Sequence, residues 1–230
     1  MNNGPQHEGL QHISSYTSKM LRQKFGRGPE SCHASLGDRF LVLYIRGFLS
    51  PMEEVLLQQG EMDTVATSRK IIIDSILPEL KGVVQLTLEI DIAACYSDWN
   101  FISNTGVIVI ELQADEGQQA TGNEFAGREA FEEEIIRLSA IVQKTPERVE
   151  SYQLSPRVMV VMRYGMLLMI EHALIQKGMG QPLRITKGEL EKKYFHADGR
   201  FDKILGQQVI DFFVDWDFKK DNSLMCFVLK

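Results

Sequence analysis

The sequence predicts an α+β protein built from two tandem homologous copies, each running helix-strand-strand-helix-strand-strand with antiparallel hairpins and packed as a pseudo-twofold pair. The first observation is length, because 230 residues suffice for two domains of about 110 residues each. The second is that both tryptophans lie in near-identical tetrapeptides, DWNF (98–101) and DWDF (215–218). The third is that further segments align in the same order at a shift of 117 or 118 residues, among them RGFLSPMEEVLLQQG (46–60) with YGMLLMIEHALIQKG (164–178).

Two more segments extend this alignment: FLVLYI (40–45) matches VMVVMR (158–163), and GPE (28–30) matches TPE (145–147). Collinear matches at four places indicate an internal duplication, and a period of this length indicates two domain-sized copies and not a solenoid. We therefore expect a disordered tail over residues 1–10, copy one over 11–113, a Gly- and Gln-rich linker over 114–127, and copy two over 128–230.

Each copy is predicted to begin with an amphipathic helix, over residues 12–24 and 128–144, because apolar residues recur there at three- and four-residue steps. Two strands follow the helix. The second strand of each pair, FLVLYI and RVMVVM (157–162), is apolar on both faces. This pattern is typical of a strand that lies inside a sheet and is covered above and below.

A strong helix start comes next in copy one. Ser50 can cap the helix, Pro51 suits its first position, and Glu53 completes a capping box. Copy two lacks this signal, since it reads LMIE (168–171). A second helical stretch is predicted over residues 65–80 and 187–203.

The repeated tetrapeptide marks the end of a strand and the entry to the closing hairpin of each copy. Asp98 and Asp215 are predicted to bind turn amides, as aspartate commonly does. Trp99 and Trp216 each share a strand face with the phenylalanine two residues further on. These aromatic pairs either close the core beneath the sheet, which we favour, or form a platform for a ligand.

The loop KFGRGPE (24–30) is the most distinctive candidate binding site. One interpretation is a small-anion site built from backbone amides and cationic side chains, with the residues Lys24, Gly26, Arg27, Gly28, Arg46 and Arg69. The alternative, which we favour, is a helix stop with a surface turn, because phosphate loops place their glycines before a helix and not after one. Arg46 and Arg69 are then solvated residues at a strand end and on a helix.

Composition and motifs argue against several functional classes. The net charge of -6 and the pI near 5.5 disfavour non-specific nucleic-acid binding. No apolar run approaches the roughly 20 residues that span a bilayer, and the N-terminus lacks a secretory signal. The three cysteines and five histidines have no metal-ligand spacing, and no nucleotide-binding or hydrolase motif is present. We therefore expect a cytoplasmic protein with buried thiols, no metal and no cofactor, and we assign no catalytic residue.

Three segments of copy one, GRGPE, FLVLYIRGFLSPMEEVLL and SDWNFISNTGVIVIEL, together resemble the bacterial MpsC-like family. The family is named after a sodium-translocating, membrane-potential-generating system. Its typical members carry a Gly-x-Gly-Pro loop, a Ser/Thr-Pro-x-Glu helix start and a late hairpin. The matching residues here are Gly26, Gly28 and Pro29; Leu49, Ser50, Pro51 and Glu53; and Asp98, Trp99 and Asn100. The resemblance implies a link to membrane energetics or to ion and bicarbonate handling, and it carries over no catalytic residue.

Copy two keeps the hairpin of this family but lacks the glycine loop and the Ser-Pro cap, so the copies are expected to have diverged in role. The leading hypothesis is a soluble cytoplasmic accessory or regulatory protein, peripheral to the membrane. It would bind a protein partner, a membrane-protein complex or a second copy of itself, with no nucleic acid and no transmembrane segment of its own. The second hypothesis is a small-anion or metabolite sensor that uses the loop 24–30. The third, an uncharacterised enzyme, has the least support from the sequence.

Overall fold

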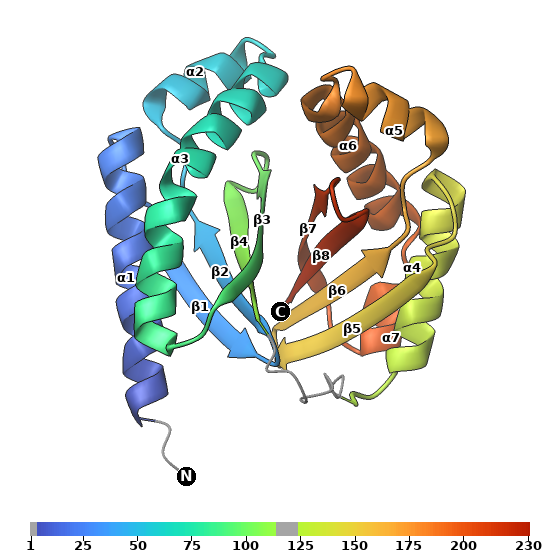
Figure 1. Ribbon diagram of the computed structural model, residues 1–230, viewed down its shortest axis with the longest axis horizontal. Coiled ribbons are helices and arrows are strands. Elements are labelled where there is room, and N and C mark those ends of the chain that lie inside the picture. Colours follow the sequence, from blue (N-terminus) through green and yellow to red (C-terminus); the bar gives the residue numbers. More distant parts are fainter. Residues whose placement is uncertain (1–3, 114–123) are drawn as a thin grey trace. The chain divides into compact units, whose positions relative to one another are not determined.

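The computed structural model of the protein describes residues 4–113 and 124–230, and the chain divides into two compact units, Met1–Gln118 and Gln119–Lys230. Each unit combines helices with a four-stranded antiparallel sheet (Figure 1). This confirms the predicted α+β class and the two similar halves. The pseudo-twofold pairing of the copies stays a prediction.

The first unit contains α1 (Gly4–Phe25), β1 (Ser31–Gly37), β2 (Phe40–Arg46), α2 (Pro51–Gln58), α3 (Met62–Leu88), β3 (Ile92–Asn100) and β4 (Thr105–Leu112). Its strand order is β1-β2-β4-β3, with β2 and β4 in the centre. These two strands are the most apolar of the four, which suits the centre of the sheet. The less apolar strands β1 and β3 form the edges, where one side of the backbone is open to solvent. Helices α1 and α3 pack on one face of the sheet through a core that includes Ile13, Leu21, Leu43, Ile73, Leu80 and Ile110.

The second unit contains α4 (Arg128–Val142), β5 (Arg148–Ser155), β6 (Val158–Tyr164), α5 (Met169–Gln176), α6 (Gly180–Asp198), α7 (Phe201–Leu205), β7 (Val209–Asp217) and β8 (Asn222–Leu229). Its strand order, β5-β6-β8-β7, repeats that of the first unit. Its core differs in composition because it contains more aromatic side chains than the core of the first unit, among them Phe131, Phe195, Phe201 and Phe227.

The structure explains why the alignment of the copies shifts from 117 to 118 residues. Strand β5 has eight residues where β1 has seven, and its pairing with β6 is irregular between Gln153 and Ser155. The additional residue is thus accommodated as a bulge within the hairpin. The copies return to the original shift before the closing hairpin, where Ile92 and Val209 begin β3 and β7.

The observed element boundaries correct three expectations. Helix α1 begins at Gly4, so the predicted disorder over residues 1–10 is wrong for residues 4–10; Leu10 packs on the core, which orders this turn. Helix α3 is longer than predicted. The single helix predicted over 187–203 is two helices, because the backbone of Gly199 is extended between α6 and α7.

Of the predicted linker 114–127, residues 114–123 lie outside the described part of the chain. The remainder is not an isolated tether, because Phe125 packs on the core of the second unit. Its ring lies edge-on to that of Phe131, with 6.0 Å between the ring centroids.

Candidate functional site

The chain turns sharply where β2 ends, and the turn explains the repeated Pro-Glu pair. Gly47 has a positive φ of 64°, and a Cβ atom placed on it would lie 2.3 Å from Cδ of Glu30. In copy two, Gly165 has φ 66° and is crossed by Glu147 at the same distance. Only glycine allows both the backbone conformation and the close approach of the glutamate stem.

Helix α2 starts immediately after this turn. The Ser50 amide donates to Oε2 of Glu53 at 2.8 Å, and the Glu53 amide donates to Oγ of Ser50 at 3.3 Å. This is a complete capping box, with Pro51 at the first helical position. The local sequence alone therefore specifies where α2 begins.

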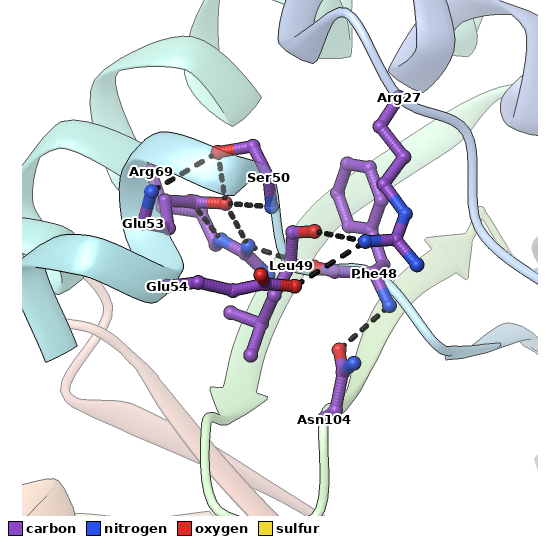
Figure 2. A network of polar contacts seen from close by, with 8 residues as sticks. All are labelled: Arg27, Phe48, Leu49, Ser50, Glu53, Glu54, Arg69 and Asn104. Carbon is purple, nitrogen blue, oxygen red and sulfur yellow. Dashed lines mark hydrogen bonds and ion pairs between the residues drawn. The ribbon is translucent and has the colours of Figure 1, made fainter. Parts of the chain in front are cut away.

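The same glutamate accepts two hydrogen bonds from Arg69 of α3 (Figure 2). Nε of Arg69 donates to Oε1 of Glu53 at 2.8 Å, and Nη2 donates to Oε2 at 2.6 Å. Nη2 also donates to the Phe48 carbonyl at 2.8 Å. Both residues are buried, Arg69 at 2% and Glu53 at 4% exposure. We call this arrangement the Arg69–Glu53 clamp, because it joins α3 to the start of α2 and to the loop before it.

Four aromatic rings enclose the guanidinium of the clamp. Its central carbon lies 4.6 Å from the centroid of the Trp99 ring, and slightly farther from those of Phe48, Phe101 and Phe25. These distances are in the range of cation–π contacts. Trp99 and Phe101 of the repeated tetrapeptide therefore close over a buried cation. In copy two, Trp216 is only 3% exposed and lies over Lys187.

The clamp is an ion pair at neutral pH. Burial alone would raise the pKa of the Glu53 carboxyl, but hydrogen bonds and charge from Arg69, with hydrogen bonds from Ser50, outweigh it. The pKa of Glu53 therefore lies below its usual value. The clamp holds the negative charge beside its cation and away from solvent.

The turn between β3 and β4 fixes the same loop from its other side. Asn104, which has a positive φ of 53°, accepts a 2.6 Å hydrogen bond from the Phe48 amide through Oδ1. Its own carbonyl accepts from the Gly47 amide at 2.9 Å. The loop that precedes α2 is thus held between α3 and this hairpin turn.

The hydrogen bonds of the turn amides involve another residue of each tetrapeptide than the predicted aspartate. Asp98 accepts from the amide of the adjacent Trp99, and Asp215 does the same in copy two. The amides of the two turns bond instead to Asn100 and to Asp217, the third letter of each tetrapeptide. Asn100 and Asp217, which stand at the turn itself, thus make the Asx interaction.

Copy two keeps the clamp with different residues. Lys187 replaces the arginine and donates to Oε1 of Glu171 at 2.9 Å. An ammonium does not form the two parallel hydrogen bonds to a carboxylate that a guanidinium forms. In copy two, Nε2 of Gln143 also donates to the carboxylate, to Oε1 of Glu171 at 2.8 Å and to Oε2 at 2.9 Å. Asp221 takes the place of Asn104 and accepts from two amides of the loop before α5. Burial lowers the pKa of Lys187, which Glu171 offsets only in part.

Copy two also contains a second buried cation, which the sequence reasoning did not find. Arg163 donates to Oε2 of Glu191 at 2.7 Å and to the hydroxyls of Ser139 and Ser223. Arg163 is fully buried and Glu191 is 1% exposed. The equivalent pair in copy one is Ile45 and Ile73. The alignment of the copies could have indicated this exchange of an apolar pair for an ion pair.

The residues predicted to bind an anion do not form one cluster. Arg27 reaches the start of α2, where Nη1 donates to the Leu49 carbonyl and pairs with Glu54, both at 3.3 Å. Arg69 belongs to the buried clamp, so it is not the solvated helix residue that we favoured. Arg27, which is partly exposed, and Arg69, which is buried, therefore both bond to carbonyls of the same short loop, Leu49 and Phe48 (Figure 2).

The other four predicted residues lie on the surface or close to it. Lys24 and Gly26 are exposed at the end of α1, and Arg46 is exposed at the end of β2. Gly28 lies against the side chain of Arg22, and a Cβ atom on it would be 2.9 Å from Nε of that arginine. In copy two, Lys144 replaces Arg27 and likewise donates to a leucine carbonyl before α5.

The geometry of the clamp supports positioning and not proton transfer, since its charged groups bond to one another and to the backbone. Residues 4–113 and 124–230 contain no cluster of three or more potential metal ligands. Burial raises the pKa of Cys32 to about 12 and that of Cys95 to about 11, so both thiols stay protonated at neutral pH. The arrangement presents α2 rigidly at the surface.

Comparison with known proteins finds one family match. Residues 6–114 match the family described as "Na+-translocating membrane potential-generating system (MpsC)". The comparisons with curated proteins and with solved structures find no match. In the described part of the chain, no helix has both the length and the apolar character needed to cross a bilayer. The resemblance predicted from the motifs of copy one is confirmed for residues 6–114, which are similar to the MpsC family.

Proposed function

We propose that the protein is an accessory or regulatory component of a membrane-potential-generating or ion-handling system. In this proposal it works in the cytoplasm beside the membrane, and copy one binds a protein partner. The family description supports the link to such a system. The observation that carries the proposal is the clamp, which fixes an exposed helix, α2, on an otherwise well-packed unit.

The proposed binding surface consists of Arg27, Met52, Glu54 and Val55. Met52 is 65% exposed and Val55 is 57% exposed, although both belong to a helix whose base is buried. Arg27 and Glu54 add an ion pair at the edge of this apolar surface. Exposed apolar residues with a charged rim are typical of protein-binding surfaces.

The rigidity of α2 supports the same conclusion. Its capping box, its contact with α3 through Arg69 and the hydrogen bonds of Asn104 fix the helix before any partner arrives. A preorganised surface loses less conformational entropy on binding. A buried ion pair contributes little net stability, so we attribute the presence of the clamp to its effect on the position of α2.

The anion-sensor hypothesis remains the alternative, because Arg22, Lys24 and Arg27 are all exposed around the loop 24–30. Two features weaken it. Arg27 is paired with Glu54, and the loop follows the C-terminal end of α1, where the helix dipole disfavours anions. A thermal-shift panel of phosphate, sulfate, bicarbonate and nucleotides tests it, since a bound ligand raises the melting temperature.

The test of the proposal is affinity capture of the tagged full-length protein from its native host with detergent-solubilised membranes. We expect a membrane protein to be enriched over a tag-only control. Arg27→Ala should reduce this enrichment, whereas Lys144→Ala, which removes the equivalent contact in copy two, should not. Capture of the protein alone, or equal loss with both variants, contradicts the proposal.

A further inference from the structure

We infer that α5 of copy two carries a docking surface for a lipid bilayer with anionic headgroups. The surface consists of the apolar residues Leu168, Met169, Ile170 and Met179 with the cations Lys177 and Lys219. This inference is independent of the partner proposed for copy one. It rests on exposed apolar area, on the charges around it, and on a comparison of the two copies.

The apolar part is unusually exposed for the start of a helix in a folded unit. Met169 is 91% exposed and Ile170 is 64% exposed, and they are adjacent in sequence. Leu168 and Met179, at either end of α5, are 37% and 48% exposed. Side chains this exposed protrude from the surface, and protruding apolar groups suit a deformable medium.

The equivalent surface of copy one shows what has changed. Residues 46–63 contain four acidic residues and one arginine, whereas residues 164–181 contain one acidic residue and one lysine. Glu54, Glu61 and Asp63 are exposed, and their counterparts are a histidine, a methionine and a glutamine. The acidic residue that copy two keeps is Glu171, which is buried in its clamp.

Cations of copy two gather around the start of α5. Nζ of Lys144 donates to the Leu167 carbonyl at 3.3 Å. Asp221 accepts from the Leu167 amide at 2.8 Å, which places the turn that carries Lys219 and Lys220 beside the same loop. The corresponding turn residues of copy one are uncharged, Ile102 and Ser103. Copy two also has Asp217 and Asp221 in this turn, where copy one has asparagines, and both aspartates accept hydrogen bonds from backbone amides.

Lys177 adds a cation at the other end of the helix. It follows the last residue of α5 and is exposed. Ile170, Ala173 and Lys177 recur at three- and four-residue steps, so they share one face of the helix. In the proposed complex, Ile170 at one end of this stripe contacts the acyl chains and Lys177 at the other end contacts the anionic headgroups. Glu147 is an exposed acid near this loop, but copy one has Glu30 at the same place, so it does not distinguish the copies.

The same features favour a bilayer over a protein as the occupant. Exposure alone does not separate the two occupants, because Met52 of copy one is as exposed as Ile170. The cations beside α5 do, and a bilayer also admits Met169 and Ile170 in any orientation. Methionine in particular adapts its shape to an irregular environment. The lysines then meet lipid phosphates, so the attraction should depend on anionic lipid and weaken as salt rises.

The experiment is sedimentation of the full-length protein with vesicles of phosphatidylcholine alone or with added phosphatidylglycerol. We expect binding to the anionic vesicles and little to the neutral ones. Ile170→Glu should lower the anionic-vesicle affinity by roughly tenfold or more, since it removes buried apolar area. Lys177→Glu, which leaves the apolar residues intact, should lower it by about ten- to thirtyfold.

Copy one supplies the matched control. Met52 is the counterpart of Ile170 and is 65% exposed, almost the same fraction. Met52→Glu should leave vesicle binding unchanged, and circular dichroism should show that all three variants fold. Binding that does not require anionic lipid, equal loss with Met52→Glu, or no binding at all overturns the inference. Capture of a protein that depends on Ile170 with no vesicle binding also overturns it. The Arg27-dependent capture of a partner by copy one is measured separately, so a failure of vesicle binding is distinguishable from a failure of the proposed function.

Discussion

Replacing Arg69 with methionine removes the cation of the clamp while keeping most of the apolar stem that the aromatic rings contact. The change removes two hydrogen bonds to Glu53, at 2.8 and 2.6 Å, and one to the Phe48 carbonyl at 2.8 Å. Glu53 is 4% exposed and is left without its cation. Breaking a buried ion pair on one side costs about 3–5 kcal/mol. We expect about 3 kcal/mol, because Ser50 still donates two hydrogen bonds to the carboxylate.

Each unit contains one tryptophan, so its unfolding can be followed separately. In a Trp216→Phe background, urea unfolding monitored by fluorescence reports on the first unit, and a Trp99→Phe background reports on the second. The free energy of unfolding of the first unit should fall by about 3 kcal/mol, while that of the second stays constant. Trp216 is itself buried, so replacing it can change the free energy of unfolding. Each Arg69→Met measurement is therefore compared with the same tryptophan variant that retains Arg69.

Two further variants separate the loss of the ion pair from general damage. Adding Glu53→Leu to Arg69→Met should recover about 1–2 kcal/mol of the lost free energy of unfolding, because it removes the unpaired buried charge. The recovery should be incomplete, because the Ser50 amide and the Phe48 carbonyl then lose their hydrogen-bond partners. Lys187→Met in copy two should cost only about 1–2 kcal/mol, since Gln143 still donates to both oxygens of Glu171. If Arg69→Met costs less than about 1 kcal/mol, or if the double variant is no more stable than the single one, our reasoning about the clamp is refuted.

Three other predictions follow from the described contacts. Gly106→Ala should destabilise the first unit by about 1–3 kcal/mol and shift the Trp99 emission, because its Cβ atom would lie 2.0 Å from the indole ring; unchanged emission would contradict this packing. Cys32 and Cys95 should react slowly with a disulfide reagent at pH 8 in the native protein and rapidly in urea, because burial raises the pKa of both thiols; fast native labelling would show that they are accessible. The pKa of Glu53 is lower in the folded than in the unfolded state, so its stabilising contribution is present above the unfolded pKa, near 4.5, and is lost as pH falls through the folded pKa. Glu53→Gln should therefore remove part of the acid sensitivity of the first unit, and an unchanged acid-unfolding profile would contradict the shift.

Local features of the fold were predictable from the sequence. The capping box at Ser50 depends on residues within one helical turn, and the buried strand at 40–45 depends on an uninterrupted apolar run. Because the sequence is duplicated, each element could be compared with its counterpart in the other copy. This comparison made the closing hairpins recognisable in both copies. The strand order was not predictable. Helices α2 and α3 separate β2 from β3 and β4, and no local signal tells which of these two strands pairs with β2.

The clamp was less accessible to sequence reasoning. Arg69 lies on a helix with charged neighbours, and nothing local distinguishes it from a solvated arginine. Its burial results from the packing of α3 beneath Phe48 and Trp99, which lie far from it in the sequence. The alignment of Glu53 with Glu171, and of Arg69 with Lys187, was the one available signal, since both copies keep a carboxylate and a cation at these positions.

The differences between the two copies support the proposed division of roles, in which copy one binds a protein and copy two binds a lipid surface. Copy one combines the family match with an acidic α2 held by the clamp. Copy two combines an apolar α5, with lysines beside it, and a second buried ion pair. One half is thereby suited to a protein partner and the other to a lipid surface. A symmetric protein would offer the same surface twice.

Site-specific photo-crosslinking in the native host tests this asymmetry most directly. A photoreactive residue is placed at Val55 on α2, which is 57% exposed, or at its counterpart Ala173 on α5, which is also exposed. We expect a discrete protein adduct from position 55 and none from position 173. Identical protein adducts from both positions, or an adduct from position 173 alone, would contradict the assignment of partner binding to copy one.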